Sequence, residues 1–253
     1  MPRFMIYYDD MTKYIDAHCH LANNTALSGI LAHAQETNVV QFINNSAKFS
    51  DWGNVIEISQ KNPDTVGTIG IHPWYISDVP KNWSEVMQDL LLQNSQIQVG
   101  EIGLDKKHTD IDKQIDIFIQ QSQIAHNLGR GISVHIIGMW DKLFEILKTY
   151  ENKLPKYIIL HSYNGPYQNM DKISEKYNLY FSFSPRNITS KKCAQHLKEL
   201  PITRILVESD TDNPVLVINV IDNMVKILNI EHNVLADIIY NNTKRILNNG
   251  QAL

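Results

Sequence analysis

Short runs of apolar and β-branched residues recur along this chain, and a longer stretch with helical spacing of apolar positions follows each of them. Short apolar runs are typical of buried strands, and the amphipathic stretches between them are typical of helices. The runs cover residues 14–16, 39–43, 65–70, 98–103, 131–135, 157–161, 180–184 and 204–208.

The clearest helical pattern covers residues 110–128, where Ile111, Ile115 and Phe118 begin a stripe of apolar positions on one face. Asp110 is predicted to be the N-cap of this helix, and Gly129 is predicted to stop it. The same spacing predicts further helices over residues 138–151, 215–228 and 232–247.

Eight alternating strand and helix units favour a parallel sheet. We predict an α/β fold of the (β/α)8 TIM-barrel type, because eight units suit closure better than an open sheet. The alternative is a doubly wound sheet, but no GxGxxG follows the first run. No linker or shift of composition marks a boundary, so residues 1–253 are expected to form a single domain.

Composition narrows the function only slightly. The 23 basic and 27 acidic residues leave a net charge of −4, which neither demands nor excludes nucleic acid. The two cysteines, Cys19 and Cys193, form no CxxC pair, and no apolar run reaches the 18 residues of a membrane span. The start of the chain lacks the apolar core of a signal peptide. The expectation is a soluble cytoplasmic protein with reduced thiols, no membrane association and no evident obligate protein partner.

A His-x-His sequence lies at the end of the first predicted strand. Side chains alternate across a strand, so His18 and His20 project to one side and Cys19 to the other. Two imidazoles on one side make half of a transition-metal site. Cys19 is therefore expected in the core rather than among the ligands.

Potential metal ligands also lie at the ends of the third, fourth, fifth, sixth and eighth predicted strands, always at the same end. In (β/α)8 barrels the active site lies at the C-terminal ends of the strands. The predicted ligands are His18, His20, Glu101, His135, His161 and Asp210, with His72 in the same region. They are more than one tetrahedral ion requires and fit two divalent ions, with Glu101 as the bridge. Asp210 is expected to bind one ion and to orient or deprotonate the attacking water.

The ordered motifs resemble those of the TatD-like metal-dependent hydrolases, often called TatD-type deoxyribonucleases, within the amidohydrolase-type barrels. The matching segments are DAHCHL from residue 16, GIHP from residue 70, GEIGLD from residue 100, the lone His135, HSYNG from residue 161, ESD from residue 208 and NTKRIL from residue 242. The resemblance covers nearly the whole chain.

This resemblance implies a set of roles. One metal would be held by His18, His20, Glu101 and Asp210, and a second by Glu101, His135 and His161. His72 would lie near the phosphate of the substrate, so that the implied catalytic residues are Asp210, Glu101 and His72. The implied cofactors are two divalent cations (Mg²⁺, Mn²⁺ or Zn²⁺), and the implied transient partner is DNA or another phosphoester.

Three departures from the family pattern concern the wall of the pocket. Ile136 and Ile137 follow the fifth-strand histidine, Lys106 and Lys107 follow GLD, and the segment 211–214 is one residue longer than usual. None of them removes a ligand. They put the DNA substrate in question more than the metal chemistry.

Two other functions stay open. The same site could hydrolyse an ester or amide of a small molecule, as other amidohydrolase-type barrels do, or the metal could be structural. A structural site tends to be closed, and the full ligand set argues against that reading.

Residues around the ligands are harder to interpret. Trp74 is interpreted as a buried loop aromatic in preference to a base-stacking platform, and Asp105 as a residue that pins a loop. Glu208 either orients a ligand or acts as a capping carboxylate. Lys106 and Arg186 are candidate phosphate contacts.

Overall fold

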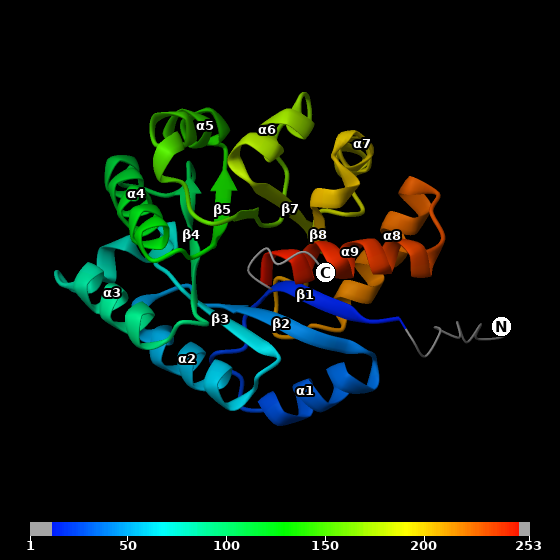
Figure 1. Cartoon of the computed structure of the whole chain (residues 1–253), viewed down its shortest axis with the longest axis horizontal. Helices are drawn as coiled ribbons and strands as arrows, with labels where there is room; N and C mark the ends of the chain where they lie inside the picture. Colours follow the sequence, from blue (N-terminus) through cyan, green and yellow to red (C-terminus); the bar gives the residue numbers. More distant parts are fainter. Residues whose placement is uncertain (1–11, 248–253) are drawn as a thin grey trace.

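The computed structural model describes residues 12–247, and within them eight strands form one parallel sheet. The strands follow one another in chain order from β1 to β8, each paired with the next (Figure 1). They are β1 (Tyr14–Cys19), β2 (Val39–Asn45), β3 (Thr65–Ile69), β4 (Gln98–Asp105), β5 (Ile132–Ile137), β6 (Ile158–Leu160), β7 (Leu179–Phe183) and β8 (Ile205–Val207). All eight predicted strands are confirmed.

Helices lie around the outside of the strands (Figure 1). They are α1 (Leu27–Glu36), α2 (Trp52–Lys61), α3 (Trp83–Gln93), α4 (Ile111–Asn127), α5 (Trp140–Thr149), α6 (Met170–Tyr177), α7 (Lys191–Glu199), α8 (Leu216–Leu228) and α9 (His232–Leu247). Short 3-10 helices cover Phe49–Asp51, Pro73–Asp78, Glu151–Lys153 and Ile202–Arg204. The predicted helix over 138–151 is thus shorter than expected and continues in a separate 3-10 turn.

The two ends of α4 test the predicted helix signals. Gly129 ends the helix as predicted, with a left-handed φ of 64° and its N–H bonded to the carbonyl of His126. Asp110 occupies the N-cap position, but its side chain makes no capping hydrogen bond. Its own backbone is left-handed there (φ 57°), whereas a capping side chain normally extends from a β-region residue.

The segment after β8 closes the barrel against β1. The N–H of Asp210 donates to the carbonyl of His18 at 2.9 Å, and the N–H of His20 donates to that of Thr211 at 2.9 Å. The buried Asp16 carboxylate accepts from the N–H groups of both His18 and Ser209. Sequential strand order and this closure confirm the barrel and exclude the doubly wound alternative.

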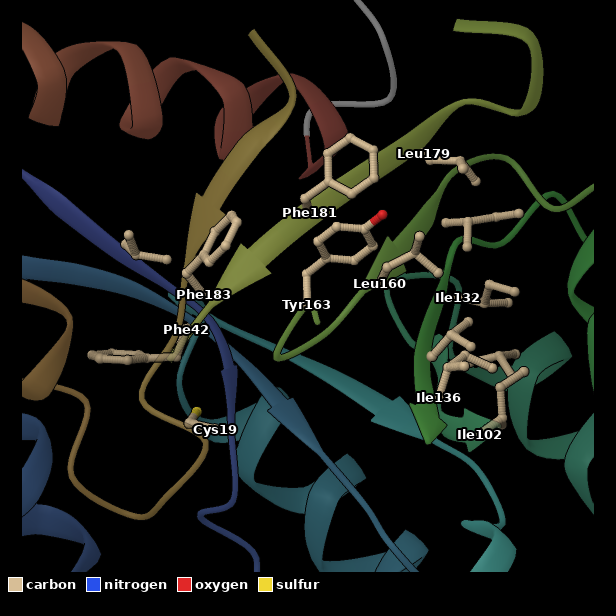
Figure 2. Close-up of a cluster of buried hydrophobic side chains, with 14 of the residues drawn as sticks. Cys19, Phe42, Ile102, Ile132, Ile136, Leu160, Tyr163, Leu179, Phe181 and Phe183 are labelled. Atoms are coloured by element: carbon tan, nitrogen blue, oxygen red, sulfur yellow. The ribbon is translucent and has the colours of Figure 1, made fainter. Parts of the chain in front are cut away.

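Neighbouring residues on the strands alternate between two apolar clusters. The larger cluster lies between the strands and the helices, and Figure 2 shows part of it. In this part the ring centres of Tyr163 and Phe181 are 4.7 Å apart. The smaller one joins Ala17, Ile43, Tyr157, Ile159, Tyr180, Leu206 and Ile246. Since Ile159 and Leu206 alternate with residues of the larger cluster, the smaller one fills the inside of the barrel.

Cys19 is fully buried in the larger cluster, as predicted. Its Sγ approaches the carbonyl of Ile43. The alternation along β1 therefore directs His18 and Cys19 to opposite sides of the strand, which leaves the histidine for the barrel mouth.

Candidate metal centre

The Glu101 carboxylate lies at the centre of five imidazole rings. Its Oε2 is 3.4 Å from Nε2 of His18 and 3.6 Å from Nε2 of His20. Its Oε1 contacts the other three rings, at 3.3 Å from Nε2 of His72, 3.3 Å from Nδ1 of His135 and 2.8 Å from Nε2 of His161. The glutamate expected to bridge two ions thus has one oxygen directed at each predicted set of histidines.

Asp210 reaches the same cluster from the segment that closes the barrel. Its Oδ1 lies 3.6 Å from Nε2 of His20, and its Oδ2 lies 3.4 Å from Nη1 of the exposed Arg186. The left-handed backbone of Asp210 (φ 54°) follows from the turn that returns the chain to β1. All six predicted ligands are therefore brought together at the C-terminal ends of the strands.

Four of the rings have a hydrogen-bond acceptor at the nitrogen that points away from Glu101. Nδ1 of His20 faces the carbonyl of Asn45 at 3.0 Å, and Nδ1 of His18 faces the Ser133 hydroxyl at 2.9 Å. Carboxylates face the other two, Asp105 for Nε2 of His135 and Glu208 for Nδ1 of His161. A proton held on the outer nitrogen leaves the inner one free for a metal.

His72 has the opposite arrangement. Its Nδ1 accepts a hydrogen bond from the backbone N–H of Trp74 at 3.1 Å, so the proton of the neutral ring belongs on Nε2, which faces Glu101. An imidazole with a protonated inner nitrogen is a donor and not a ligand. His72 nevertheless lies with Glu101 and His135 in one of the groups of side chains that could hold a metal, so its role at the substrate stays a prediction.

Glu208 and Asp105 are more closely tied to the ligands than the sequence indicated. Glu208 is fully buried and accepts from the N–H of Ser162 at 2.8 Å and from the hydroxyl of Ser182. Its carboxylate also lies near enough to His18 and His161 to form a third potential ligand group. Asp105 pins its loop through the N–H of Lys107, as expected, and contacts His135 as well.

Ser133 and Asn45 were missed by the sequence analysis. The Ser133 hydroxyl contacts Nδ1 of His18, and the backbone carbonyl of Asn45 contacts Nδ1 of His20. For Ser133 a signal existed, because it precedes His135 by two positions on β5 and so faces the same side. Its partner, however, is His18 on a distant strand, which a strand pattern cannot identify.

Burial and charge set the protonation of the metal-free centre. Burial acts to raise the pKa of Glu101, but the charge of His161 and its hydrogen bond to the carboxylate hold it well below its usual range. Burial acts to lower the pKa of His161, and Glu101 and Glu208 raise it well above 6.5 instead. The pKa of His20 is raised by Asp210 and Glu101 against the opposing effect of burial. The buried carboxylates are thus ionised, and protons on the imidazoles balance their charge. Such a set of ligands is suited to divalent cations.

A cavity of about 590 Å³ opens directly above the cluster. Lys48 and Arg186 contribute exposed cations to its wall, and Ile136 and Ile137 contribute apolar surface. A second hollow of about 580 Å³ shares His20, Arg186 and Asp210 with it. The candidate metal centre thus lies where the two hollows meet.

We expect Ser133→Ala to lower divalent-metal affinity by about 10- to 100-fold, because the His18 ring loses the group that fixes its orientation. Isothermal titration of the metal-free protein measures this. Ser174→Ala is the matched control, since Ser174 is equally buried but bonds only the backbone of α6. Equal affinities for the two variants would contradict an orienting role for Ser133.

The chain belongs to the TatD related DNase family. The model of that family matches residues 15–248, from the second residue of β1 to beyond the end of α9. Membership confirms the predicted class of enzyme, a metal-dependent hydrolase that acts on ester bonds.

Relatives and solved structures agree with this assignment. An uncharacterised metal-dependent hydrolase of Methanocaldococcus jannaschii is 26% identical over 91% of this chain and 95% of its own length. The deoxyribonuclease TATDN3 of Homo sapiens is 26% identical over 80% of this chain and 78% of its own. The TatD homologue YjjV of Escherichia coli superposes with a TM-score of 0.85 at 21% identity, covering 93% of this chain and 98% of that one. The last likeness shows the barrel fold alone.

Proposed function

We propose that this chain acts as a single barrel domain that hydrolyses phosphodiester bonds of DNA with two divalent cations. The observation that carries the proposal is the Glu101 carboxylate, whose two oxygens face two separate groups of imidazole nitrogens below an open cavity. The deoxyribonuclease name of the human relative supports DNA as the substrate class.

The donor set fits two ions. His18, His20, Glu101 and Asp210 would hold the first, and Glu101, His135 and His161 the second. Nitrogen and carboxylate ligands accept Mg²⁺, Mn²⁺ or Zn²⁺, and availability decides among them. When bound, such ions lower the pKa of water toward neutrality and neutralise charge on the phosphate.

The remaining chemistry comes from residues of the chain. Asp210 lines the cavity beside His20, which places its carboxylate to accept the proton of the attacking water. The hydrogen bond from His20 and nearby imidazolium charge overcome burial and set its pKa at about 2, so the group is ionised. His72 donates its Nε2 proton in a hydrogen bond to a phosphate oxygen. Arg186, exposed beside Asp210, binds a second phosphate oxygen by charge and hydrogen bonding.

Degradation of single-stranded DNA by metal-stripped protein tests this function. The protein is re-supplied in turn with Mg²⁺, Mn²⁺ and Zn²⁺, and cleavage that returns with an ion supports the proposal. If the protein binds metal and no ion restores cleavage, DNA is the wrong substrate. Small phosphoesters, esters and amides are then the alternatives to screen.

Metal binding should strengthen as pH rises. The raised pKa values of His161 and His20 mean that protons occupy nitrogens that a metal needs, and they remain there above pH 6.5. For each proton that the metal must displace, the affinity for the metal falls about tenfold per pH unit below the pKa of the imidazole that holds this proton. Titration between about pH 6 and 8 in buffers of different ionisation enthalpy measures the protons released. Affinity that does not change over this range would contradict the assignment of His20 and His161 as ligands.

Location and partners are part of the proposal. No helix within residues 12–247 has the length and apolar character of a membrane span. Both cysteines are buried free thiols, which suits the predicted reducing cytoplasm. DNA is proposed as a transient partner, without an obligate protein partner.

A further inference from the structure

Trp74 forms an aromatic part of the cavity wall beside the candidate metal centre. It was interpreted as a buried loop aromatic, and that interpretation is wrong, because 51% of the residue is exposed. The cause is its position in the 3-10 helix Pro73–Asp78. His72, just before this helix, faces Glu101, and Trp74 lines the cavity. Large apolar side chains with this exposure are rare among residues 12–247, the others being Leu92 and Val234.

The indole is held in place despite its exposure. Its N–H donates to Oδ2 of the buried Asp105 at 2.7 Å, and Asp105 also contacts His135. The exposed His108 ring stacks on the indole, with the two ring centres 5.0 Å apart and an interplanar angle of 26°. A fixed, solvent-facing indole loses little conformational entropy when a ligand stacks on it.

The indole also lies close to the reacting groups. Its ring centre is 4.9 Å from that of His72 and 6.0 Å from that of His135. Lys48 and Arg186 line the same cavity. A ligand that spans this wall meets an aromatic side chain next to the proposed phosphate-binding centre, which is a combination typical of proteins that bind single-stranded nucleic acid.

We propose that Trp74 is a stacking platform for the nucleobase next to the scissile phosphate. This inference rests on the proposed function and extends it to substrate choice. Every base offers a π-face, so the platform selects for an accessible base and not for a particular one.

Two oligomers of equal length test the platform, one of about ten thymidines and one with the bases replaced by abasic sites. The wild-type protein should have a KM for the thymidine oligomer about 5- to 150-fold lower than for the abasic oligomer. In Trp74→Ala this preference should fall to near one, and in Trp74→Phe most of it should remain, since the Phe ring still stacks. Leu92→Ala, an exposed apolar residue on α3, is the matched control and should keep the full preference.

The Phe variant separates stacking from support of the metal centre. Phe lacks the N–H that binds Asp105, so a loss of preference equal to that in Trp74→Ala would overturn the inference and assign Trp74 a positioning role through His135. A wild-type protein that cleaves both oligomers equally well would overturn it too. A wild-type protein that cleaves neither with any ion would instead refute the nuclease function.

Fluorescence of the metal-free protein gives a readout that does not depend on cleavage. Trp52 and Trp83 are buried and Trp140 is half-buried against Tyr163, so the largest part of the quenching by added thymidine oligomer should come from Trp74 and should be lost in Trp74→Phe. Quenching that is undiminished in this variant, or that the abasic oligomer produces equally, would contradict stacking on Trp74.

Discussion

Glu101→Ala is expected to abolish metal-dependent hydrolysis and to leave at most one weakly held ion. Glu101 is the predicted ligand shared by both groups of histidines, so its loss removes a ligand from each proposed ion at once. Changes to residues that merely orient ligands cost about 10- to 100-fold in affinity or activity. Removal of the shared ligand should therefore cost more than about 100-fold in kcat/KM for DNA.

Three measurements make this result specific. Elemental analysis counts the bound ions, hydrolysis of single-stranded DNA gives the rate, and circular dichroism shows that the barrel is still folded. Glu57→Ala is the matched control, since it removes a fully exposed carboxylate paired only with Lys61. A Glu101→Ala protein that keeps two ions and full turnover would refute the bridging assignment.

Much of the fold follows from patterns that are local in sequence. The strands are buried on both faces and therefore appear as short apolar runs, and the helices cover them with one apolar stripe. Helix α9 has the predicted bounds, and β6 differs from its predicted run by one residue at each end. The end of helix 138–151 was less predictable, because the choice between α and 3-10 geometry over 151–153 depends on packing and not on periodicity.

The candidate ligands were predictable for a topological reason. Parallel strands of a barrel end at one rim, so polar residues after successive strands must meet there. The proton positions were not predictable in this way, since the tautomer of His18 depends on Ser133 and that of His72 on a backbone N–H. The exposure of Trp74 was misjudged because an apolar side chain is usually buried, and only the direction of the loop after β3 overrides that tendency.

The second large effect is expected for Asp210→Asn, which should lower turnover by about 10² or more and leave the fold intact. The Asp210 carboxylate is ionised, with a pKa of about 2, and it lines the cavity where the water would lie, whereas an amide at this position cannot take a proton. Asn is the appropriate substitution because residue 210 has a left-handed backbone with φ of 54°, a conformation that Asn adopts readily and Ala does not. The N–H that closes the barrel to His18 is unchanged in the variant.

Steady-state kinetics at saturating metal separates the two roles proposed for Asp210. A loss confined to kcat, with both ions still bound, indicates proton transfer, whereas a loss that excess metal restores indicates ligation. Asp237→Asn, an exposed position on α9, controls for the general effect of removing a carboxylate. If turnover by Asp210→Asn matched the wild type at every metal concentration, neither role would hold, and the proton acceptor would have to be another group in contact with the cavity. The next candidates would be Glu101 and His161, whose Oε1 and Nε2 atoms lie 2.8 Å apart, and each would be substituted and tested in the same way.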